Sequence, residues 1–229
     1  MIISHKYKFI FIKTTKTAGT SVEVFLSQHC GPDDVLTPIR PPVAPHVARN
    51  YMGLWNPLPE IVSDYGLKRF RSILTRFLKR RKFYNHIPAR TVKQLVSSEV
   101  WNGYFKFCVE RNPWDKTLSH YHMVKDRSGE NLSFDQYLQK GRFSVNYPIY
   151  CDGRGGLLVD KVVKYESLMD ELGVIFAKLG IPFNGTLGVK AKSEHRKDRT
   201  PYQQIYKEQQ KEIVEKAFQK EIAMHGYTF

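Results

Sequence analysis

The segment from residue 16 to residue 21 combines a lysine, a glycine and three hydroxyl groups, and it could bind an anionic group. It consists of Lys16, Thr17, Ala18, Gly19, Thr20 and Ser21. Gly19 lets the backbone approach an anion closely, and Lys16 supplies a mobile positive charge where charge would build on a leaving oxygen. The hydroxyl groups of Thr17, Thr20 and Ser21 can donate hydrogen bonds. Thr20 and Ser21 also suit a plain helix N-cap, so an anion-binding loop and a capped helix both stay open.

The order of residues in this segment differs from that of a Walker A loop. In a Walker A loop the lysine follows the second glycine and stands directly before Ser or Thr. Here Lys16 precedes Gly19. The reversed order argues against an ATPase or a kinase.

A second segment with candidate site residues follows the apolar run at 104–109. It begins with Glu110 and Arg111 and includes Ser119 eight residues after the arginine. Open α/β sheets place ligand-binding residues at the carboxyl ends of their strands. A guanidinium at a strand end and a hydroxyl two helical turns later could converge on one phosphate. The spacing alone does not decide this.

Together the two segments resemble the nucleotide motifs of sulfotransferases that use PAPS (3′-phosphoadenosine 5′-phosphosulfate). Residues 16–21 look like the 5′-phosphosulfate loop, and Arg111-Asn112-Pro113-Trp114-Asp115 with Ser119 looks like the 3′-phosphate motif. The similarity is greatest to the carbohydrate-type branch, including soluble bacterial members, and it extends over most of the chain. The segments 160–166 and 191–193 also resemble that branch.

This resemblance implies an activity and a role for each matching residue. It implies a P-loop-like α/β fold and transfer of the sulfuryl group from PAPS to a hydroxyl or amine, with release of PAP (3′,5′-ADP). By the same resemblance Lys16 stabilises the bridging oxygen as its bond to sulfur breaks, while Arg111 and Ser119 bind the 3′-phosphate. Many relatives have Pro directly before the loop lysine, where this chain has Thr15. The geometry at the start of the loop is therefore an open question.

Transfer to a hydroxyl also needs a proton acceptor, for which His or Glu is suited. His86 resembles, in position, a His before a short helix that is taken as the base in related enzymes. His86 could instead contact that helix or support the donor loop, or lie on the surface. His46 could face the acceptor, although a lone loop His is more often exposed. Glu23 could orient a substrate group, although a solvated helix position is the expected one.

Two further groups of residues bear on ligands. The basic cluster near the end of the chain, with Lys192 and Arg196, is either a solvated loop or, by the resemblance, a loop that closes over the nucleotide. His120 and His122 are two residues apart on an expected helix, so they point to different faces and make a poor metal pair. We predict no metal site.

Composition sets the broad class of the protein. The chain has 229 residues and is 41% hydrophobic, enough for one core, so we expect a single domain over 1–229 with an acceptor-side insertion at 31–100. Lys and Arg exceed Asp and Glu by 36 − 22 = 14, so this basic protein should attract polyanions. Its three widely spaced cysteines indicate reduced thiols. With neither a signal peptide nor a run of about 20 apolar residues, a cytoplasmic location is expected.

The pattern of apolar residues predicts alternating strands and helices. Strands are predicted at 8–12, 104–109 and 159–165, and helices at 21–26, 67–82, 88–96, 113–125, 167–179 and 201–223. The Pro-rich stretch at 31–59 should be irregular. This alternation predicts an α/β fold with three layers, in which helices flank a central, mostly parallel sheet.

The helix predicted at 67–82 is amphipathic and strongly basic, and the stretch from 66 to 83 contains no Asp or Glu. It is either an ordinary surface helix or a weak contact to an acceptor, a polyanion or an anionic membrane surface. Two other functions compete with the transferase: a nucleic-acid or polyanion-binding module and a P-loop-type small-molecule kinase. The binding module does not explain two nucleotide motifs at strand ends, so no nucleic acid is expected. The kinase is disfavoured by the reversed loop order and by the lack of a clear Mg²⁺-binding Asp at the end of an apolar strand. The acceptor, a glycan or a small alcohol, is not fixed by any residue pattern.

Overall fold

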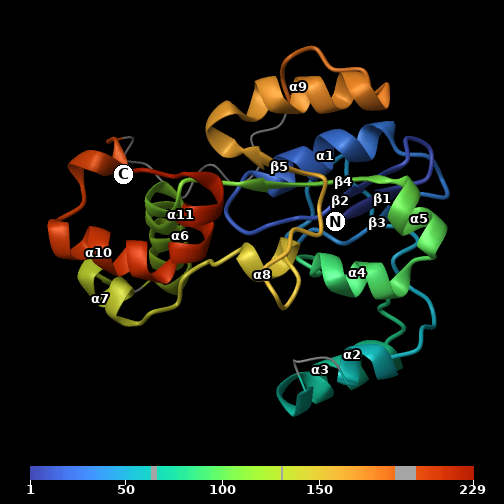
Figure 1. Cartoon of the computed structure of the whole chain (residues 1–229), viewed down its shortest axis with the longest axis horizontal. Helices are drawn as coiled ribbons and strands as arrows, with labels where there is room; N and C mark the ends of the chain where they lie inside the picture. Colours follow the sequence, from blue (N-terminus) through green and yellow to red (C-terminus); the bar gives the residue numbers. More distant parts are fainter. Residues whose placement is uncertain (63–65, 130, 189–199) are drawn as a thin grey trace.

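The structure is a computed structural model, and it describes residues 1–62, 66–129, 131–188 and 200–229. These residues form a central sheet with helices on both sides (Figure 1). Its five strands lie in the order β3-β1-β2-β4-β5. Their bounds are Ile2–Ser4 (β1), Phe9–Phe11 (β2), Val35–Leu36 (β3), Phe105–Glu110 (β4) and Lys161–Lys164 (β5). The predicted α/β fold is confirmed, and β2, β4 and β5 correspond to the three predicted strands.

The sheet is parallel in one half and antiparallel in the other. β4 runs parallel to β2 and to β5. β1, which the sequence did not predict, runs antiparallel to β2 and to β3. The parallel half carries both predicted motifs, because parallel strands end at the same edge of a sheet and bring the segments after them together.

One face of the sheet is covered by α1 (Gly19–His29) and α9 (Leu168–Leu179). Phe9 and Phe11 of β2 and Phe107 of β4 belong to the core on this face. Successive strand residues point to opposite faces, so this alternation fixes the register of the sheet.

The other face is covered by three short helices. They are α4 (Ala89–Leu95), α5 (Ser98–Gly103) and α8 (Tyr147–Tyr150). Ile10 and Ile12 pack here with Cys108 of β4. The predicted arrangement of a sheet between two helical layers is therefore present. Cys30, Cys108 and Cys151 are unpaired, as predicted.

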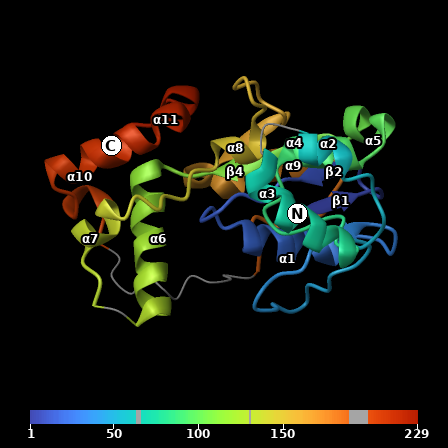
Figure 2. The same ribbon diagram turned by 90° about the horizontal axis from the view of Figure 1, so that it is seen from below.

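A group of four helices lies to one side of the sheet in both views (Figures 1 and 2). The group consists of α6 (Pro113–Ser128), α7 (Phe134–Gln139), α10 (Glu208–Ala217) and α11 (Gln219–His225). It has its own core, which includes Trp114, Leu118 and Phe218. α6 begins as predicted at Pro113, and the side chain of Asn112 caps it by accepting a hydrogen bond from the N–H of Trp114 (3.1 Å).

The prediction of one long helix at 201–223 is wrong. The chain there forms a 3₁₀ turn at Tyr202–Gln204 and then α10 and α11, which meet at Phe218. Phe218 leaves helical geometry (φ −112°, ψ 20°) and its side chain is fully buried. The break directs both helices onto the same core. A second 3₁₀ turn, Tyr165–Ser167, shortens the predicted strand at 159–165.

The range 31–100 is only partly separate from the sheet. β3 joins the sheet and α4 covers it, whereas α2 (Leu58–Val62) and α3 (Gly66–Leu78) stand away from it (Figure 1). α3 is the predicted basic helix, ending four residues early. None of the helices in the described part of the chain is long and apolar enough to cross a bilayer.

Candidate functional site

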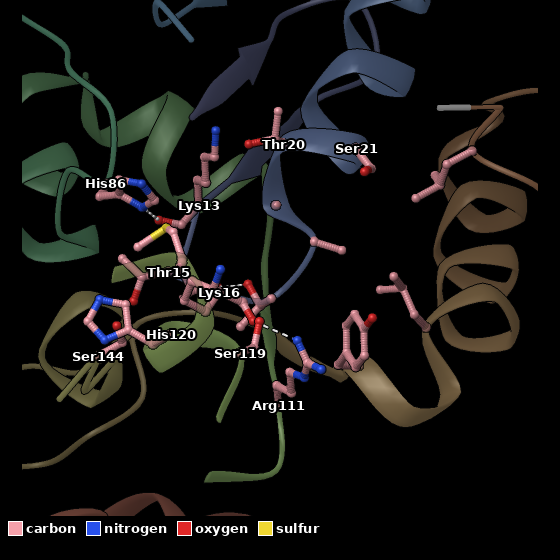
Figure 3. Close-up of a pocket in the computed structure, with 18 of the residues that line it drawn as sticks. Lys13, Thr15, Lys16, Thr20, Ser21, His86, Arg111, Ser119, His120 and Ser144 are labelled. Carbon is pink, nitrogen blue, oxygen red and sulfur yellow. Dashed lines mark hydrogen bonds between the residues drawn. The ribbon is translucent and has the colours of Figure 1, made fainter. Parts of the chain in front are cut away.

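The two predicted motifs line the same cavity. It has a volume of about 1230 Å³ and lies where β2 and β4 end. Its lining includes the whole segment 13–21, together with Arg111, Ser119 and His86. In the view of Figure 3, Lys16 lies between His86 and Lys13 on one side and Arg111 and Ser119 on the other. Every predicted catalytic or cofactor-binding residue that the structure describes therefore lines this cavity.

The loop at residues 16–21, called the donor loop after its predicted role, has an alternating backbone geometry suited to an anion. Lys16 (φ 62°) and Ala18 (φ 56°) are left-handed, and Thr17 between them is not. Successive N–H groups in alternating right- and left-handed conformations form a concave nest that binds anions. Left-handed geometry costs a residue with a side chain of order 1–3 kcal/mol and concentrates at functional sites.

The start of α1 excludes the plain helix cap. Ala18 occupies the N-cap position, and no side chain caps the helix. Thr20 and Ser21 lie inside the first turn, which contains no acidic residue. The first N–H groups of α1 therefore face the cavity at the positive end of the helix dipole. This geometry favours the anion-binding interpretation of the loop.

The hydroxyl group of Thr17 is committed inside the protein. Thr14 donates its hydroxyl proton to the carbonyl of Val109, and the Thr14 and Thr17 hydroxyl oxygens lie 2.7 Å apart. Because a hydroxyl has a single proton, Thr17 must be the donor in this second bond. The prediction that its hydroxyl contacts the sulfuryl donor is corrected. In this structure only the backbone N–H of Thr17 can donate a hydrogen bond to an anion in the cavity. The bonds tie the loop to the end of β4.

Gly19 is required by the packing of Lys13. A Cβ at position 19 would lie 2.9 Å from Cγ of Lys13 and 3.3 Å from the carbonyl oxygen of Thr14. Lys13 runs past the glycine and forms a buried ion pair with Glu23. Glu23 is fully buried, not solvated as predicted. Burial opposes its ionisation, but the N-terminal ammonium and Lys13 outweigh burial and lower its pKa.

Thr15, which stands where many proteins with a similar loop have proline, is held by Asn146. The N–H and the hydroxyl of Thr15 both donate to Oδ1 of Asn146 (2.9 and 2.6 Å), and Nδ2 of Asn146 donates to the carbonyl of Thr15 (3.0 Å). The same Nδ2 lies 3.2 Å from Oε1 of Glu110. A proline at position 15 could not donate the N–H bond. In this chain the side chain of Asn146, 131 positions further along, restrains the backbone at Thr15 through these hydrogen bonds.

Arg111 is oriented by three groups around its guanidinium. Nε and Nη2 lie 2.8 and 2.6 Å from Oδ2 of Asp115, and Nη1 lies 3.5 Å from the carbonyl oxygen of Lys16. The guanidinium also stacks on the ring of Tyr165 at 4.3 Å. Arg111 thus links the second motif to the donor loop. Ser119, two turns into α6, completes this part of the lining.

The imidazole of His86 is neutral at pH 7, the state in which it can accept a proton. Burial, followed by the charge of Lys13, lowers its pKa to about 4. Its Nδ1 lies 3.1 Å from the carbonyl oxygen of Lys13. A neutral ring donates Nδ1–H to that carbonyl, which leaves the lone pair on Nε2. His86 therefore also supports the donor loop, the alternative role predicted for it, and its φ of 56° is left-handed like those of Lys16 and Ala18.

His120 is a cavity residue that the sequence analysis missed as a candidate base. Its Nδ1 lies 2.6 Å from the hydroxyl of Tyr137, and burial together with Lys16 lowers its pKa to about 4. Figure 3 shows its ring near Lys16, Thr15 and Ser144. No sequence signal singled it out, because adjacent helical residues such as Ser119 and His120 point about 100° apart, and which of them reaches the cavity depends on how α6 packs.

Three other predictions concern other parts of the sequence. Lys192 and Arg196 lie outside the described residues. His46 is buried, not exposed as expected, and its Nε2 lies 2.9 Å from the carbonyl oxygen of Thr37. Among the described residues no group of three or more His, Cys, Asp or Glu is placed to share a metal ion. The absence of a metal site stays a prediction.

Comparisons with known proteins give one relative, an uncharacterized protein, and distant structural likenesses. No family model matches the chain. An uncharacterized protein of Archaeoglobus fulgidus is 32% identical over 102 residues, which is 42% of this chain and 84% of that protein. A sulfotransferase from Alicyclobacillus acidocaldarius has a TM-score of 0.45 at 15% identity, over 97% of this chain and 96% of its own. Mouse sulfotransferase SULT7A1, solved with PAP, has a TM-score of 0.44 at 15% identity, over 96% and 86%.

Proposed function

We propose that this protein is a sulfotransferase that moves the sulfuryl group from PAPS to a hydroxyl or amine of an acceptor and releases PAP. One observation carries the proposal. Two motifs that resemble the two ends of a PAPS site, with Lys16 and Arg111 95 positions apart, line one cavity and touch each other there. A cavity of about 1230 Å³ has room for the nucleotide and an acceptor, since ligand pockets span about 300–1,000 Å³.

The two motifs would bind opposite ends of the nucleotide. The N–H groups of residues 17–21 and the hydroxyls of Thr20 and Ser21 would hold the 5′-phosphosulfate at the start of α1. Arg111 and Ser119 would hold the 3′-phosphate, with the ring of Tyr165 keeping the guanidinium plane in place. Lys192 and Arg196 would add contacts to the nucleotide from the basic cluster.

The reaction would be a single in-line displacement at sulfur. The acceptor oxygen forms a bond to sulfur as the bond from sulfur to the bridging oxygen of PAPS breaks. The electron pair of the broken bond stays on that oxygen, where Lys16 offsets the new negative charge. The proton of the acceptor hydroxyl passes to Nε2 of His86, which is neutral at pH 7. The protein thus supplies position and charge rather than a covalent intermediate.

The acceptor would enter from the side of the cavity lined by Arg40, Asn85 and His86. These residues come from the range 31–100, which the sequence analysis predicted as the acceptor side. We propose a carbohydrate or a small alcohol, following the resemblance to the carbohydrate-type branch. The three unpaired thiols fit a protein that works in the reducing cytoplasm.

Nucleotide-dependent melting tests the proposal directly. PAP at 100 times its dissociation constant should stabilise the fold by about 2.7 kcal/mol and raise the melting temperature, whereas ATP with Mg²⁺ should not. A panel of sugars and alcohols with radiolabelled PAPS should then yield a labelled product. Stabilisation by ATP and Mg²⁺ alone would favour a kinase, and stabilisation by nucleic acid alone would favour a polyanion-binding module. Either result would overturn the transferase.

A further inference from the structure

The pair of helices α2 and α3 is fixed to the protein by one face of α3. Ile73 is 3% exposed, and the ring of Phe77 lies 5.6 Å from the ring of Trp55. Arg76 forms an ion pair with Glu60 and lies 4.3 Å from the ring of Tyr84. These contacts set the rotation of α3 about its axis. The one described acidic side chain of α2 is therefore used in packing.

The adjoining face of α3 is apolar and exposed. Phe70, Leu74 and Leu78 recur at four-residue steps and are 40%, 44% and 73% exposed. This row lies one residue, about 100° of helix rotation, from the buried row of Ile73 and Phe77. Further large apolar side chains are exposed in the segment before α3 and on α2: Met52, Leu54, Leu58 and Val62 are all at least 55% exposed. Monomeric proteins seldom leave so many neighbouring large apolar side chains in water.

Basic side chains accompany this apolar surface, and acids do not. Arg71 follows Phe70 on α3, and Lys79, Arg80 and Arg81 follow Leu78, all exposed. The stretch 66–83 has no Asp or Glu, in a chain whose formal net charge is +14. A second copy of the chain would bring like charges together, which is unfavourable. A nucleic acid would satisfy the cations but would leave the apolar row in water.

We propose that α2 and α3 form a docking surface for an anionic membrane. Phe70, Leu74 and Leu78 insert at the boundary between headgroups and acyl chains, and the basic side chains contact the anionic headgroups. The protein then lies on the bilayer without crossing it. The proposal does not depend on the reaction, since none of these side chains lines the cavity.

Vesicle binding by the full chain tests this proposal. The protein should sediment with vesicles of phosphatidylcholine and phosphatidylglycerol and not with phosphatidylcholine alone, and binding should fall as salt rises. Replacing Phe70, Leu74 and Leu78 together with Gln should weaken binding at least tenfold. The matched control replaces Leu157, Val174 and Ile213 with Gln, because these side chains are 51%, 73% and 40% exposed on other elements. The control variant should bind like the original protein.

Replacing basic residues with Gln measures the electrostatic contribution to vesicle binding. Arg71, Lys79 and Arg81 changed to Gln should weaken binding by roughly fivefold per charge removed, whereas the same change at Arg142, Arg154 and Lys216 should have much less effect. Three results would overturn the proposal: no binding to anionic vesicles at low salt, equal loss in the test and control variants, or a dimer in analytical ultracentrifugation that the apolar variant abolishes.

Discussion

The two ends of the cavity differ in how their residues are held. At the donor end, hydrogen bonds of backbone and side chain connect the loop to Asn146, to Arg111, and through Thr14 to β4. At the acceptor end, Arg40, Asn85 and His86 come from segments outside regular structure. Oδ1 of Asn85 is buried without a hydrogen-bond partner among the described residues. A preorganised end suits a common donor, and a less tied end suits a variable acceptor.

The largest effect is expected for Lys16→Ala at the donor end. Transfer should fall by about 10² to 10³, because a preorganised charge opposite the leaving oxygen is lost. PAP affinity should stay within a few fold, since PAP lacks the transferred group. The measurements are single-turnover rates with labelled PAPS and calorimetry with PAP.

Lys8→Ala is a matched control for this variant. Lys8 is also a left-handed lysine (φ 53°) but is exposed and does not line the cavity. Both variants place alanine at a left-handed backbone position, so a difference between their transfer rates is due to the loss of the Lys16 side chain. Equal rates for Lys16→Ala and the original protein would remove Lys16 from the mechanism.

At the acceptor end, His86→Gln should slow transfer by about 10², the lower limit for loss of a general base. His120→Gln removes the other cavity imidazole and should slow transfer less. Transfer rates measured across the pH range distinguish a histidine that acts as the general base from one that only supports the loop. Replacing the base should remove the fall in the transfer rate at acidic pH. If His120→Gln is the more damaging change, the base is His120 and His86 only supports the loop.

A third test asks whether Arg111 reads the 3′-phosphate. Arg111→Ala should weaken PAP binding by about 10- to 100-fold, because a hydrogen bond to a charged group contributes about 1.5–3 kcal/mol. Adenosine 5′-monophosphate lacks the 3′-phosphate and should bind the variant and the original protein alike. Equal losses for both nucleotides would place Arg111 elsewhere on the ligand.

Two asparagines, one at each end, give a direct comparison of stability. Asn146→Leu leaves the N–H of Thr15 without its partner and should lower the free energy of unfolding by about 3 kcal/mol. Asn85→Leu removes an unsatisfied buried oxygen and should leave stability unchanged or raise it by up to about 1 kcal/mol. Urea unfolding measures both. Equal destabilisation by the two changes would mean that the ends are held alike.

The last test concerns the pH dependence of stability. The pKa of His86 is lowered to about 4, so between pH 4 and 6.5 the unfolded chain binds a proton at this ring that the folded chain does not. The free energy of unfolding should therefore rise with pH across this window, with about 3 kcal/mol from His86. His86→Gln should flatten the slope, as measured by urea unfolding at several pH values. An unchanged slope would show that the ring is solvated in the folded protein.

The donor end could be predicted from the sequence because its residues follow strands directly. A short apolar run, a loop with Lys16 and Gly19, and Arg111 after the next run fix both position and order once the strands pair in parallel. Asn146 and Glu23 could not be predicted, because their partners lie 131 and 10 positions away and depend on the packing of separate elements. For the acceptor end, the sequence predicted the range 31–100 but not the arrangement of its residues, since loops carry no periodic pattern.

Asn146 also ties the donor loop to the C-terminal helices. Its own N–H donates to Oε1 of Glu221 on α11 at 3.0 Å, while its side chain holds Thr15 and reaches Glu110. A ligand that steadies the loop must therefore steady the docking of α11, which belongs to a separate core. Hydrogen exchange should report this as slower exchange of α11 amides when PAP is bound, although no residue of α11 lines the cavity. The four-helix group and the sheet would then unfold as one cooperative unit in the presence of the nucleotide.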